Sequence, residues 1–438
     1  MKIAIIGTGI SGLGAAWLLN DLHDITVYEK ASRLGGHSNT VEVDYDGVPI
    51  PVDTGFIVYN ELNYPNLTAL FKHLGVATEE SNMSFAFSTP NSSVEWCGDN
   101  LNTIFTYRRN ALRPRFLSML TNIIKFNRLS FVDLMAGKLS GLSLGEYLES
   151  RGYSSSFREQ YLLPMGAAIW STSLKDMLAF PAASFVQFFT NHRLINSRNE
   201  RPQWRTVTGG SREYVKWLSS SFVEKIHLNS KLIRVMRDAA GVIIKHADGH
   251  TEKYDQVIFA CHSNEALELL GDPSHQEEAL LGAIKYEPNK VILHRDSSLM
   301  PRRQKAWASW NYMRESDGSA YEKPASVTYW MNRLQNIDKK YPLFVSLNPA
   351  REPDPDLTFA SLEYMHPLYN KAALAAQKQL DVIQGIRDTW FCGAYFGYGF
   401  HEDGLISGLN VAERLGAKRP WDKRQMPSAS APIIQAAE

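Results

Sequence analysis

The first thirty residues constrain this chain more than any other stretch. An apolar run of strand type, Lys2 to Ile6, leads into the glycine turn Gly7-Thr8-Gly9-Ile10-Ser11-Gly12, and a helical stretch then precedes a second strand-like run that ends at Glu29. In such a unit the glycines permit a tight turn, close approach to a pyrophosphate and close packing of helix on strand. The helix N-terminus then faces the phosphates. The pattern therefore predicts a dinucleotide-binding site.

The residues after this turn narrow the choice of dinucleotide. Glu29 lies seventeen residues after Gly12, where an acid accepts hydrogen bonds from ribose hydroxyls and repels a 2′-phosphate, which disfavours NADP. Arg33-Leu34-Gly35-Gly36 follows directly. The block from Glu29 to Gly36 resembles the extended fingerprint of the flavoprotein superfamily that includes flavin amine oxidases, protoporphyrinogen oxidases and carotenoid desaturases. The resemblance implies that the cofactor is FAD.

A second motif of this superfamily lies near the other end of the chain. The stretch Asp388 to Gly408 resembles the C-terminal flavin motif, in which a strand delivers a glycine loop and a helix begins under the pyrimidine ring. The resemblance implies that backbone amides from Gly404 onward stabilise negative charge on the reduced flavin. Cys392 does not match the cysteine that some relatives bond to flavin. We therefore expect a non-covalent cofactor.

Three shorter segments between the two motifs also resemble the family. Val52 to Ile57 resembles the stretch that approaches the isoalloxazine ring, with Gly55 leaving room for the ring, although a glycine at a strand end is the alternative. Leu232 occupies the position whose main chain meets the adenine. Lys290 matches a lysine bonded through water to flavin N5, and burial there would lower its pKa; an exposed lysine is the alternative.

The resemblance thus implies a complete set of site residues. The expected cofactor-binding residues are Gly7, Gly9, Ser11, Gly12, Glu29, Lys30, Arg33, Gly35, Gly36, His37, Gly55, Phe56, Leu232, Gly393, Glu402, Asp403, Gly404, Leu405 and Ser407. The expected catalytic residue is Lys290, and the expected substrate contacts are Tyr398 and Phe400. Phe400 replaces the cage tyrosine of amine oxidases, which weakens an amine cage without excluding one. His37 and His401 lie beside the expected flavin contacts in the sequence. Each of them either contacts the flavin or is a structural histidine.

Length and composition limit the remaining possibilities. At 438 residues the chain exceeds one ordinary core, so two interlocked domains are expected. Lysine plus arginine equals aspartate plus glutamate, 46 each, which gives no global field for nucleic acid. Cys97, Cys261 and Cys392 lie far apart, which argues against disulfides and a metal site and fits a reducing cytosol.

The predicted fold class is α/β, with a Rossmann-type FAD-binding domain interleaved with a mixed α+β substrate domain. The expected FAD-binding segments are residues 1–85, 203–285 and 386–419, the substrate domain comprises 86–202 and 286–385, and 420–438 form a tail. The N-terminal apolar run could pass for a signal peptide, but its glycine spacing fits a nucleotide site better. No apolar stretch is long enough to span a bilayer, so a cytoplasmic protein, soluble or peripheral to the inner face of the membrane, is expected.

The stretch Leu101 to Leu139 has an unusual composition. Its part from Leu101 to Val132 has no acid and six basic residues interleaved with large apolar ones, which are Arg108, Arg109, Arg113, Arg115, Lys125 and Arg128. Such a stretch can lie on an anionic membrane or guide an acyl substrate. The alternative is a helical cap whose arginines are merely solvated.

These observations favour an FAD-dependent oxidoreductase that takes a hydride from a C–H bond of an apolar acyl substrate, by dehydrogenation or isomerisation. The resemblance is strongest to a bacterial amine oxidase-like branch linked to lipid modification. A true amine oxidase that acts on a C–N bond and a non-redox FAD isomerase or mutase stay open. The sequence does not determine the substrate, the electron acceptor or the oligomeric state.

Overall fold

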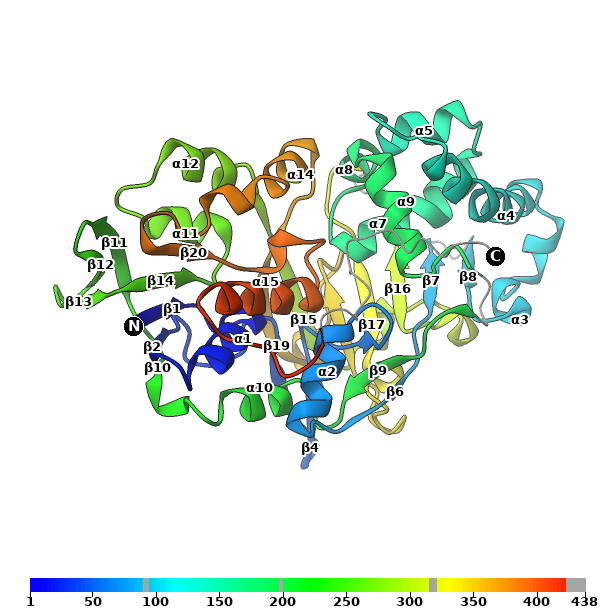
Figure 1. Cartoon of the computed structure of the whole chain (residues 1–438). Coiled ribbons are helices and arrows are strands. Elements are labelled where there is room, and N and C mark those ends of the chain that lie inside the picture. Colours follow the sequence, from blue (N-terminus) through cyan, green and yellow to red (C-terminus); the bar gives the residue numbers. More distant parts are fainter. Residues whose placement is uncertain (90–93, 197–199, 315–320, 423–438) are drawn as a thin grey trace.

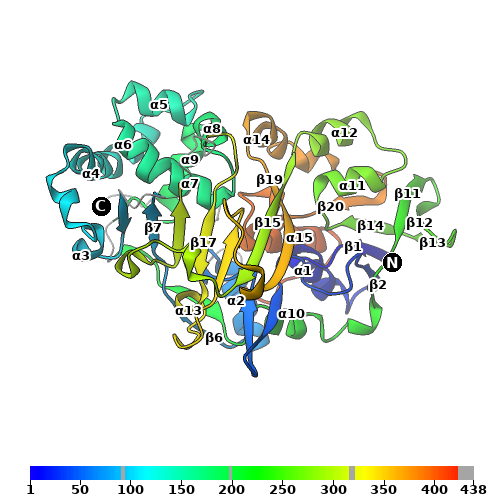
Figure 2. The ribbon, with the colours of Figure 1, turned by 180° about the vertical axis from the view of Figure 1, so that it is seen from behind.

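A computed structural model describes residues 1–89, 94–196, 200–314 and 321–422. The chain forms two halves, each built on one main sheet (Figure 1). One half contains the N-terminus and the helices α1 (Ile10–Leu19) and α15 (His401–Arg414), and the other carries a helical layer at the opposite end of the molecule. The view from behind shows the same division (Figure 2).

The first half is a parallel five-stranded sheet in the order β10-β2-β1-β14-β20. Its strands are β1 (Lys2–Ile6), β2 (Asp24–Tyr28), β10 (Ile226–His227), β14 (Gln256–Phe259) and β20 (Thr389–Phe391). The apolar residues of β1 alternate: Ile3 and Ile5 pack with α1, α2 and α15, while Ala4 and Ile6 pack with α11 and α12. Helices on both faces bury this sheet fully, as parallel sheets require. The Rossmann-type prediction is confirmed.

Smaller elements complete this half. They are α2 (Pro65–Leu74), α10 (Arg212–Ser219), α11 (Ser263–Leu269), α12 (His275–Gly282), α14 (Lys371–Gln377), the sheet of β5 (Tyr59–Asn60), β9 (Trp204–Val207) and β6 (Thr78–Ser81), and the sheet of β11 (Leu232–Asp238), β12 (Gly241–His246) and β13 (Thr251–Tyr254). β3 (Thr40–Tyr45) and β4 (Val48–Asp53) form a hairpin, as the alternating apolar residues on either side of Asp46-Gly47 predict. The turn residues Asp46 and Gly47 both have positive φ, 52° and 88°.

The second half contains a seven-stranded mixed sheet, β19-β15-β18-β17-β16-β7-β8. Its strands are β7 (Phe85–Ser88), β8 (Glu95–Cys97), β15 (Tyr286–His294), β16 (Trp310–Met313), β17 (Val327–Trp330), β18 (Phe344–Leu347) and β19 (Thr358–Pro367). The helical layer comprises α3 (Leu101–Ile104), α4 (Pro114–Met135), α5 (Leu144–Ser150), α6 (Ser155–Phe157), α7 (Leu163–Trp170), α8 (Leu174–Ala179) and α9 (Ala182–Asn191). An aromatic core joins this layer to the sheet through Phe87 and Tyr312.

The mixed α/β fold class is therefore confirmed, whereas the exact domain boundaries stay a prediction. Of the expected tail, residues 423–438 lie outside the described part of the chain. Within the described residues, no helix combines the length and the apolar character needed to cross a bilayer.

Candidate functional site

The glycine turn joins β1 to α1, and its three glycines serve different purposes. A Cβ on Gly7 would lie 2.7 Å from the carbonyl oxygen of Ala260, and one on Gly12 would lie 2.0 Å from the carbonyl oxygen of Gly7. Both positions must be glycine for the turn to pack. A Cβ on Gly9 would meet nothing within 4 Å among the described residues. The open side of Gly9 thus gives a ligand access to the first amides of α1, which have no helical partners.

Glu29 is buried at the end of β2 and faces this turn. Its Oε2 accepts hydrogen bonds from the backbone N–H and the hydroxyl of Thr8, at 3.0 and 2.5 Å, and its Oε1 accepts one from Ala31 N at 2.8 Å. Oε1 therefore retains a lone pair for a further donor. The Glu29 backbone bonds to the segment before β11, because Ser230 N donates to Glu29 O at 2.8 Å. This contact brings Leu232, at the start of β11, near the acid.

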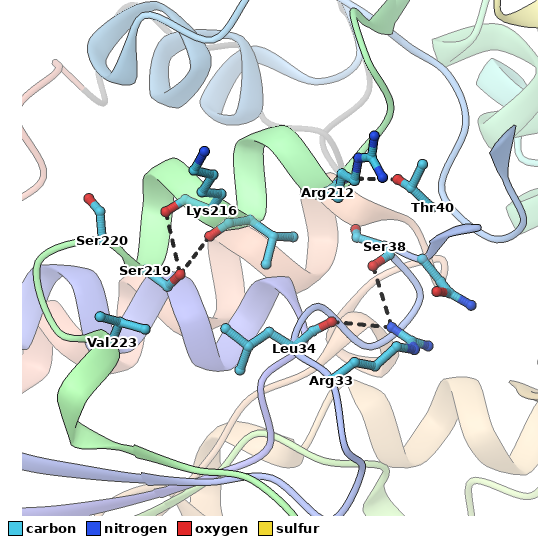
Figure 3. A pocket seen from close by; sticks show the side chains of 11 residues that line it. Arg33, Leu34, Ser38, Thr40, Arg212, Lys216, Ser219, Ser220 and Val223 are labelled. Carbon is cyan, nitrogen blue, oxygen red and sulfur yellow. Dashed lines mark hydrogen bonds between the residues drawn. The ribbon is translucent and has the colours of Figure 1, made fainter. Parts of the chain in front are cut away.

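The loop of residues 33–38 lies against the glycine turn. A Cβ on Gly36 would be 3.2 Å from Gly9 Cα, and Gly35 has a φ of +100°. The Arg33 guanidinium donates to the carbonyl oxygens of Gly36 and Leu34, at 2.7 and 3.2 Å. Arg33 therefore holds the loop in shape. The loop and α10 enclose a pocket of about 510 Å³, lined by Arg33, Leu34, Ser38, Thr40, Arg212 and Lys216 among others (Figure 3).

Three expected cofactor-binding residues have side chains that contact other protein groups. The Lys30 ammonium forms an ion pair with Glu265 at the surface. The buried Glu402 carboxylate accepts hydrogen bonds from the backbone N–H groups of Asn66 and Leu67, at 2.8 and 2.9 Å, and so caps the N-terminus of α2. Asp403 accepts hydrogen bonds from the backbone N–H groups that precede α15. A buried carboxylate needs such donors, and backbone N–H groups of the protein supply them to Glu402 and Asp403.

Gly55 is required by the packing of the protein itself. A Cβ on Gly55 would lie 2.2 Å from the carbonyl oxygen of His37, and Phe56 N donates to that same oxygen at 2.8 Å. The glycine makes room for the 33–38 loop, and its expected approach to a flavin ring stays a prediction. Phe56 stacks on His401 with ring centroids 3.8 Å apart, and His401 Nε2 is 2.9 Å from both Ser38 Oγ and Tyr214 Oη. Four chain segments therefore meet here.

His37 belongs to a cluster of aromatic rings. Its ring lies 4.9 Å from Tyr364, 5.5 Å from His366 and 6.2 Å from His262, measured between ring centroids. Burial lowers the pKa of all three histidines, that of His366 to about 4, so they are neutral at physiological pH. Tyr364 and His366 come from β19 and were missed in the sequence, because no motif marks that strand.

α15 brings a second helix N-terminus to the glycine turn. The helix begins at His401, and Gly404 N already donates to Phe400 O at 3.0 Å. The amides without helical partners are therefore those of residues 401–403, one turn earlier than expected. A Cβ on Gly404 would lie 2.9 Å from Ile10 Cγ2, and one on Gly408 would lie 2.1 Å from Ser11 O. These glycines allow α15 to approach α1.

Other residues of the C-terminal motif fix the same contact. Ser407 Oγ accepts a hydrogen bond from Gly393 N at 2.9 Å and donates one to Gly404 O at 2.7 Å. Leu405 is fully buried, and its side chain fills the space beside Gly14 of α1. The side chains of this motif thus position the helix, and its backbone amides are the groups left for a ligand.

Lys290 does not occupy the buried position expected from the resemblance. It lies on β15 with its side chain 46% exposed, and its ammonium pairs with Glu352. Its neighbours Asn289 and Val291 are buried, since successive residues of a strand point to opposite faces. The expectation of a buried Lys290 is therefore wrong.

Tyr398 and Phe400 lie where the two halves meet. The Phe188 ring of α9 is 5.3 Å from the Phe400 ring and 5.7 Å from the Tyr398 ring, and it stacks on His192 at 3.9 Å. Burial lowers the pKa of His192 to about 4, so this ring is also uncharged. The contact of α9 with Phe400 joins two distant segments, so no sequence motif predicts it.

Phe188, Tyr398 and Phe400 form an aromatic wall, to which the buried hydroxyl of Tyr369 adds one polar group. A Cβ on Gly399 would lie 2.8 Å from Tyr369 Oη, which places that hydroxyl beside the Tyr398–Phe400 loop. Within the described residues, Tyr369 Oη has no hydrogen-bond partner. A buried hydroxyl without a partner is costly, which makes it a candidate ligand contact.

Together these residues fit a flavin dinucleotide. Two helix N-termini lie side by side and offer positive ends to phosphate and to a ring that gains charge. The open side of Gly9 and the remaining acceptor of Glu29 suit a pyrophosphate and a ribose. Among the described residues, no group of three or more histidine, cysteine, aspartate or glutamate side chains is arranged to hold a metal ion.

Comparison with solved structures shows which known folds are similar. A CLA-producing fatty acid isomerase from P. acnes superimposes with a TM-score of 0.68 at 15% identity, covering 95% of this chain and 98% of that one. Putrescine oxidase bound to putrescine gives 0.66 at 14% identity, covering 95% and 99%. Cyclohexylamine oxidase from Brevibacterium oxydans gives 0.65 at 16% identity, covering 94% and 99%. At such identities the likeness establishes the fold.

Sequence comparison identifies the family. A Mycobacterium tuberculosis protein named as a flavin-containing monoamine oxidase is 26% identical over 269 residues, which are 58% of this chain and 55% of that protein. An L-amino acid oxidase from Bothrops pictus is 22% identical over 67% of this chain and 59% of its own length. The match thus spans little more than half of each relative. The model of the flavin-containing amine oxidoreductases matches residues 10–390, so the chain belongs to this family of flavin-dependent oxidoreductases.

Proposed function

We propose that the flavin is FAD, bound without a covalent bond. The adenosine half needs an acceptor for ribose hydroxyls, and the Glu29 carboxylate offers one beside the glycine turn. Burial raises the pKa of the Cys392 thiol to about 12, which keeps it protonated and unreactive. Two phosphates would lie at the N-terminus of α1, next to the open side of Gly9.

We further propose that the substrate is apolar and of acyl type. The observation that supports this proposal is the wall formed by Phe188, Tyr398 and Phe400 between the two halves. The histidine in this wall, His192, is held neutral by burial. The acids nearest in sequence, Glu402 and Asp403, each have a carboxylate occupied by two backbone N–H groups. A cationic amine could contact the aromatic faces of this wall. It would, however, lose its hydration without forming an ion pair with a carboxylate, which disfavours its binding.

The residues of the site have separate tasks in this proposal. The bound flavin supplies the capacity to accept a hydride from a substrate C–H bond. The amides at the start of α15 stabilise negative charge that develops on the ring. The wall excludes water and holds an alkyl chain, and the Tyr369 hydroxyl is the polar group that orients its functional end.

The cofactor proposal is tested on the purified protein. Acid denaturation should release a yellow compound that co-migrates with FAD in chromatography, and the precipitated protein should be colourless. Release of FMN would exclude the dinucleotide assignment. Colour that stays with the precipitate would show a covalent bond and contradict the proposal.

The substrate proposal is tested by anaerobic bleaching of the flavin. Unsaturated fatty acids or their phospholipid esters should reduce the flavin, and primary amines at the same concentration should not. Bleaching by amines alone would support the amine oxidase alternative. Conversion of a fatty acid to an isomer without an electron acceptor would instead identify an isomerase, for which the fatty acid isomerase of similar fold is a precedent.

A further inference from the structure

The helix α4 is apolar on two sides. Its inner side packs into the core of the helical layer through Phe116, Met119 and Phe126. Its outer side also carries exposed apolar residues at helical spacing, which are Leu117, Ile124, Val132 and Met135. A helix on the surface of a soluble domain normally has a polar outer side. The cap function considered from the sequence accounts for the inner side and leaves the outer side unexplained.

The exposed apolar residues are concentrated in this part of the molecule. Of the 17 large apolar side chains that are exposed in the described residues, seven lie between Leu101 and Met135. Leu101 of α3 and Leu112 of the 3-10 helix η1 (Arg108–Leu112) are 74% and 85% exposed. α3 and α4 lie at the end of the molecule farthest from the parallel sheet (Figures 1 and 2). We call the exposed side of α3, η1 and α4 the outer face.

The outer face is also basic. Arg108, Arg109, Arg115 and Arg128 are exposed, and none of the four forms an ion pair with any other described residue. The other two basic residues of this stretch are used internally: Lys125 donates to Arg151 O, and Arg113 lies over the Tyr107 ring. No acid occurs from residue 101 to residue 132. Arg108 donates to Asn102 Oδ1, a neutral partner, so the charges of all four arginines are left for anionic groups.

We propose that the outer face docks on an anionic lipid bilayer. Exposed apolar side chains enter the boundary between headgroups and acyl chains, while arginines bind lipid phosphates. A second copy of this chain is a poor occupant, because a two-fold contact would place eight uncompensated arginines together. The proposal does not depend on the proposed substrate, since lipid binding is measured without turnover.

The test uses flotation of the purified flavin-bound protein with vesicles. Wild-type protein should float with vesicles of phosphatidylglycerol and phosphatidylcholine at low salt, and less so at high salt, because salt screens the charges. Each arginine near an anionic surface contributes about a fivefold increase in partitioning. The variant Arg108→Gln/Arg109→Gln/Arg115→Gln/Arg128→Gln should therefore bind several hundredfold more weakly.

A matched control separates the outer face from total charge. The variant Lys245→Gln/Lys253→Gln/Lys378→Gln/Lys418→Gln removes four exposed lysines from the other half of the molecule and should float like wild type. The variant Ile124→Ser/Val132→Ser should float about tenfold less well, because it removes apolar insertion and keeps the charge. Flavin absorbance and circular dichroism establish that each variant is folded.

Three results would overturn the proposal. One is wild-type protein that stays with the soluble fraction at low salt. Another is equal loss of binding in the arginine and lysine variants, which would indicate a general charge effect. The third is a dimer in analytical ultracentrifugation that Ile124→Ser/Val132→Ser dissociates, which would assign the outer face to self-association.

Discussion

Replacing Gly9 by alanine should separate cofactor binding from folding. Gly9 has a φ of −64° and a ψ of 176°, which alanine adopts without strain. The added Cβ would meet no described atom within 4 Å. Alanine also restricts the unfolded chain more than glycine does, so the apoprotein should be more stable by about 0.4–1 kcal/mol.

The same methyl group should weaken FAD binding. It would stand on the open side of the turn, where a phosphate must approach the first amides of α1. Losing one charge-assisted hydrogen bond costs about 1.5–3 kcal/mol, which corresponds to a rise of about 10- to 150-fold in Kd. Fluorescence titration of apoprotein with FAD measures the Kd, and urea unfolding of the apoprotein measures the stability.

Gly408→Ala is the opposing control. Its Cβ would lie 2.1 Å from Ser11 O, a backbone atom, so α15 must shift from α1 and the apoprotein should lose about 1–3 kcal/mol. Gly9→Ala should thus lose FAD while it keeps its fold, whereas Gly408→Ala should lose stability. An unchanged Kd for FAD in Gly9→Ala, or an apoprotein as unstable as that of Gly408→Ala, would refute the reasoning.

Three further predictions concern charged residues. Glu29→Ala should raise the Kd for FAD by about 10- to 150-fold, through loss of a charge-assisted hydrogen bond to the ribose; a titration that gives the wild-type Kd would remove Glu29 from the site. Lys290→Met should leave flavin reduction and reoxidation unchanged in stopped-flow measurements, because the ammonium pairs with Glu352 at the surface; a slowed half-reaction would restore its flavin role. Burial raises the pKa of Glu402 from 4.5 to about 7, so its contribution to stability is greatest below pH 4.5 and declines by about 3 kcal/mol as the pH rises through 7. Urea unfolding from pH 5 to 8 should show this decline in wild type and a smaller one in Glu402→Gln; parallel curves would contradict it.

The sequence predicted the backbone of the site better than its side chains. The order of β1, the glycine turn, α1 and β2 is local, so a short motif determines it. The hairpin at Asp46 and Gly47 is local as well, because both residues must adopt positive φ. These parts needed no knowledge of distant segments.

Side-chain directions depend on distant partners that no motif encodes. Glu402 faces the N-terminus of α2 because Asn66 and Leu67, more than 330 residues earlier, supply the donors. Lys290 is exposed because its side chain points to the face of β15 that other elements leave uncovered. Which face is covered depends on the strands and helices that pack against β15. The contact of Phe188 with Phe400 likewise joins two halves whose arrangement the sequence does not state.

The glycines show why resemblance alone assigns too many residues to a cofactor. A Cβ on Gly7, Gly55 or Gly408 would lie within 3 Å of a backbone atom of another segment, and one on Gly12 would lie within 3 Å of the Gly7 carbonyl oxygen. The fold therefore requires glycine at these four positions whether or not a ligand binds. At Gly9 the fold itself makes no such demand. The fold would accept a side chain at position 9, yet the motif has glycine there. We therefore infer that the missing side chain at Gly9 leaves space for the ligand. By this criterion we expect the phosphates of the proposed FAD to approach at Gly9, while the other glycines bring α1, α15 and the 33–38 loop close together around that position.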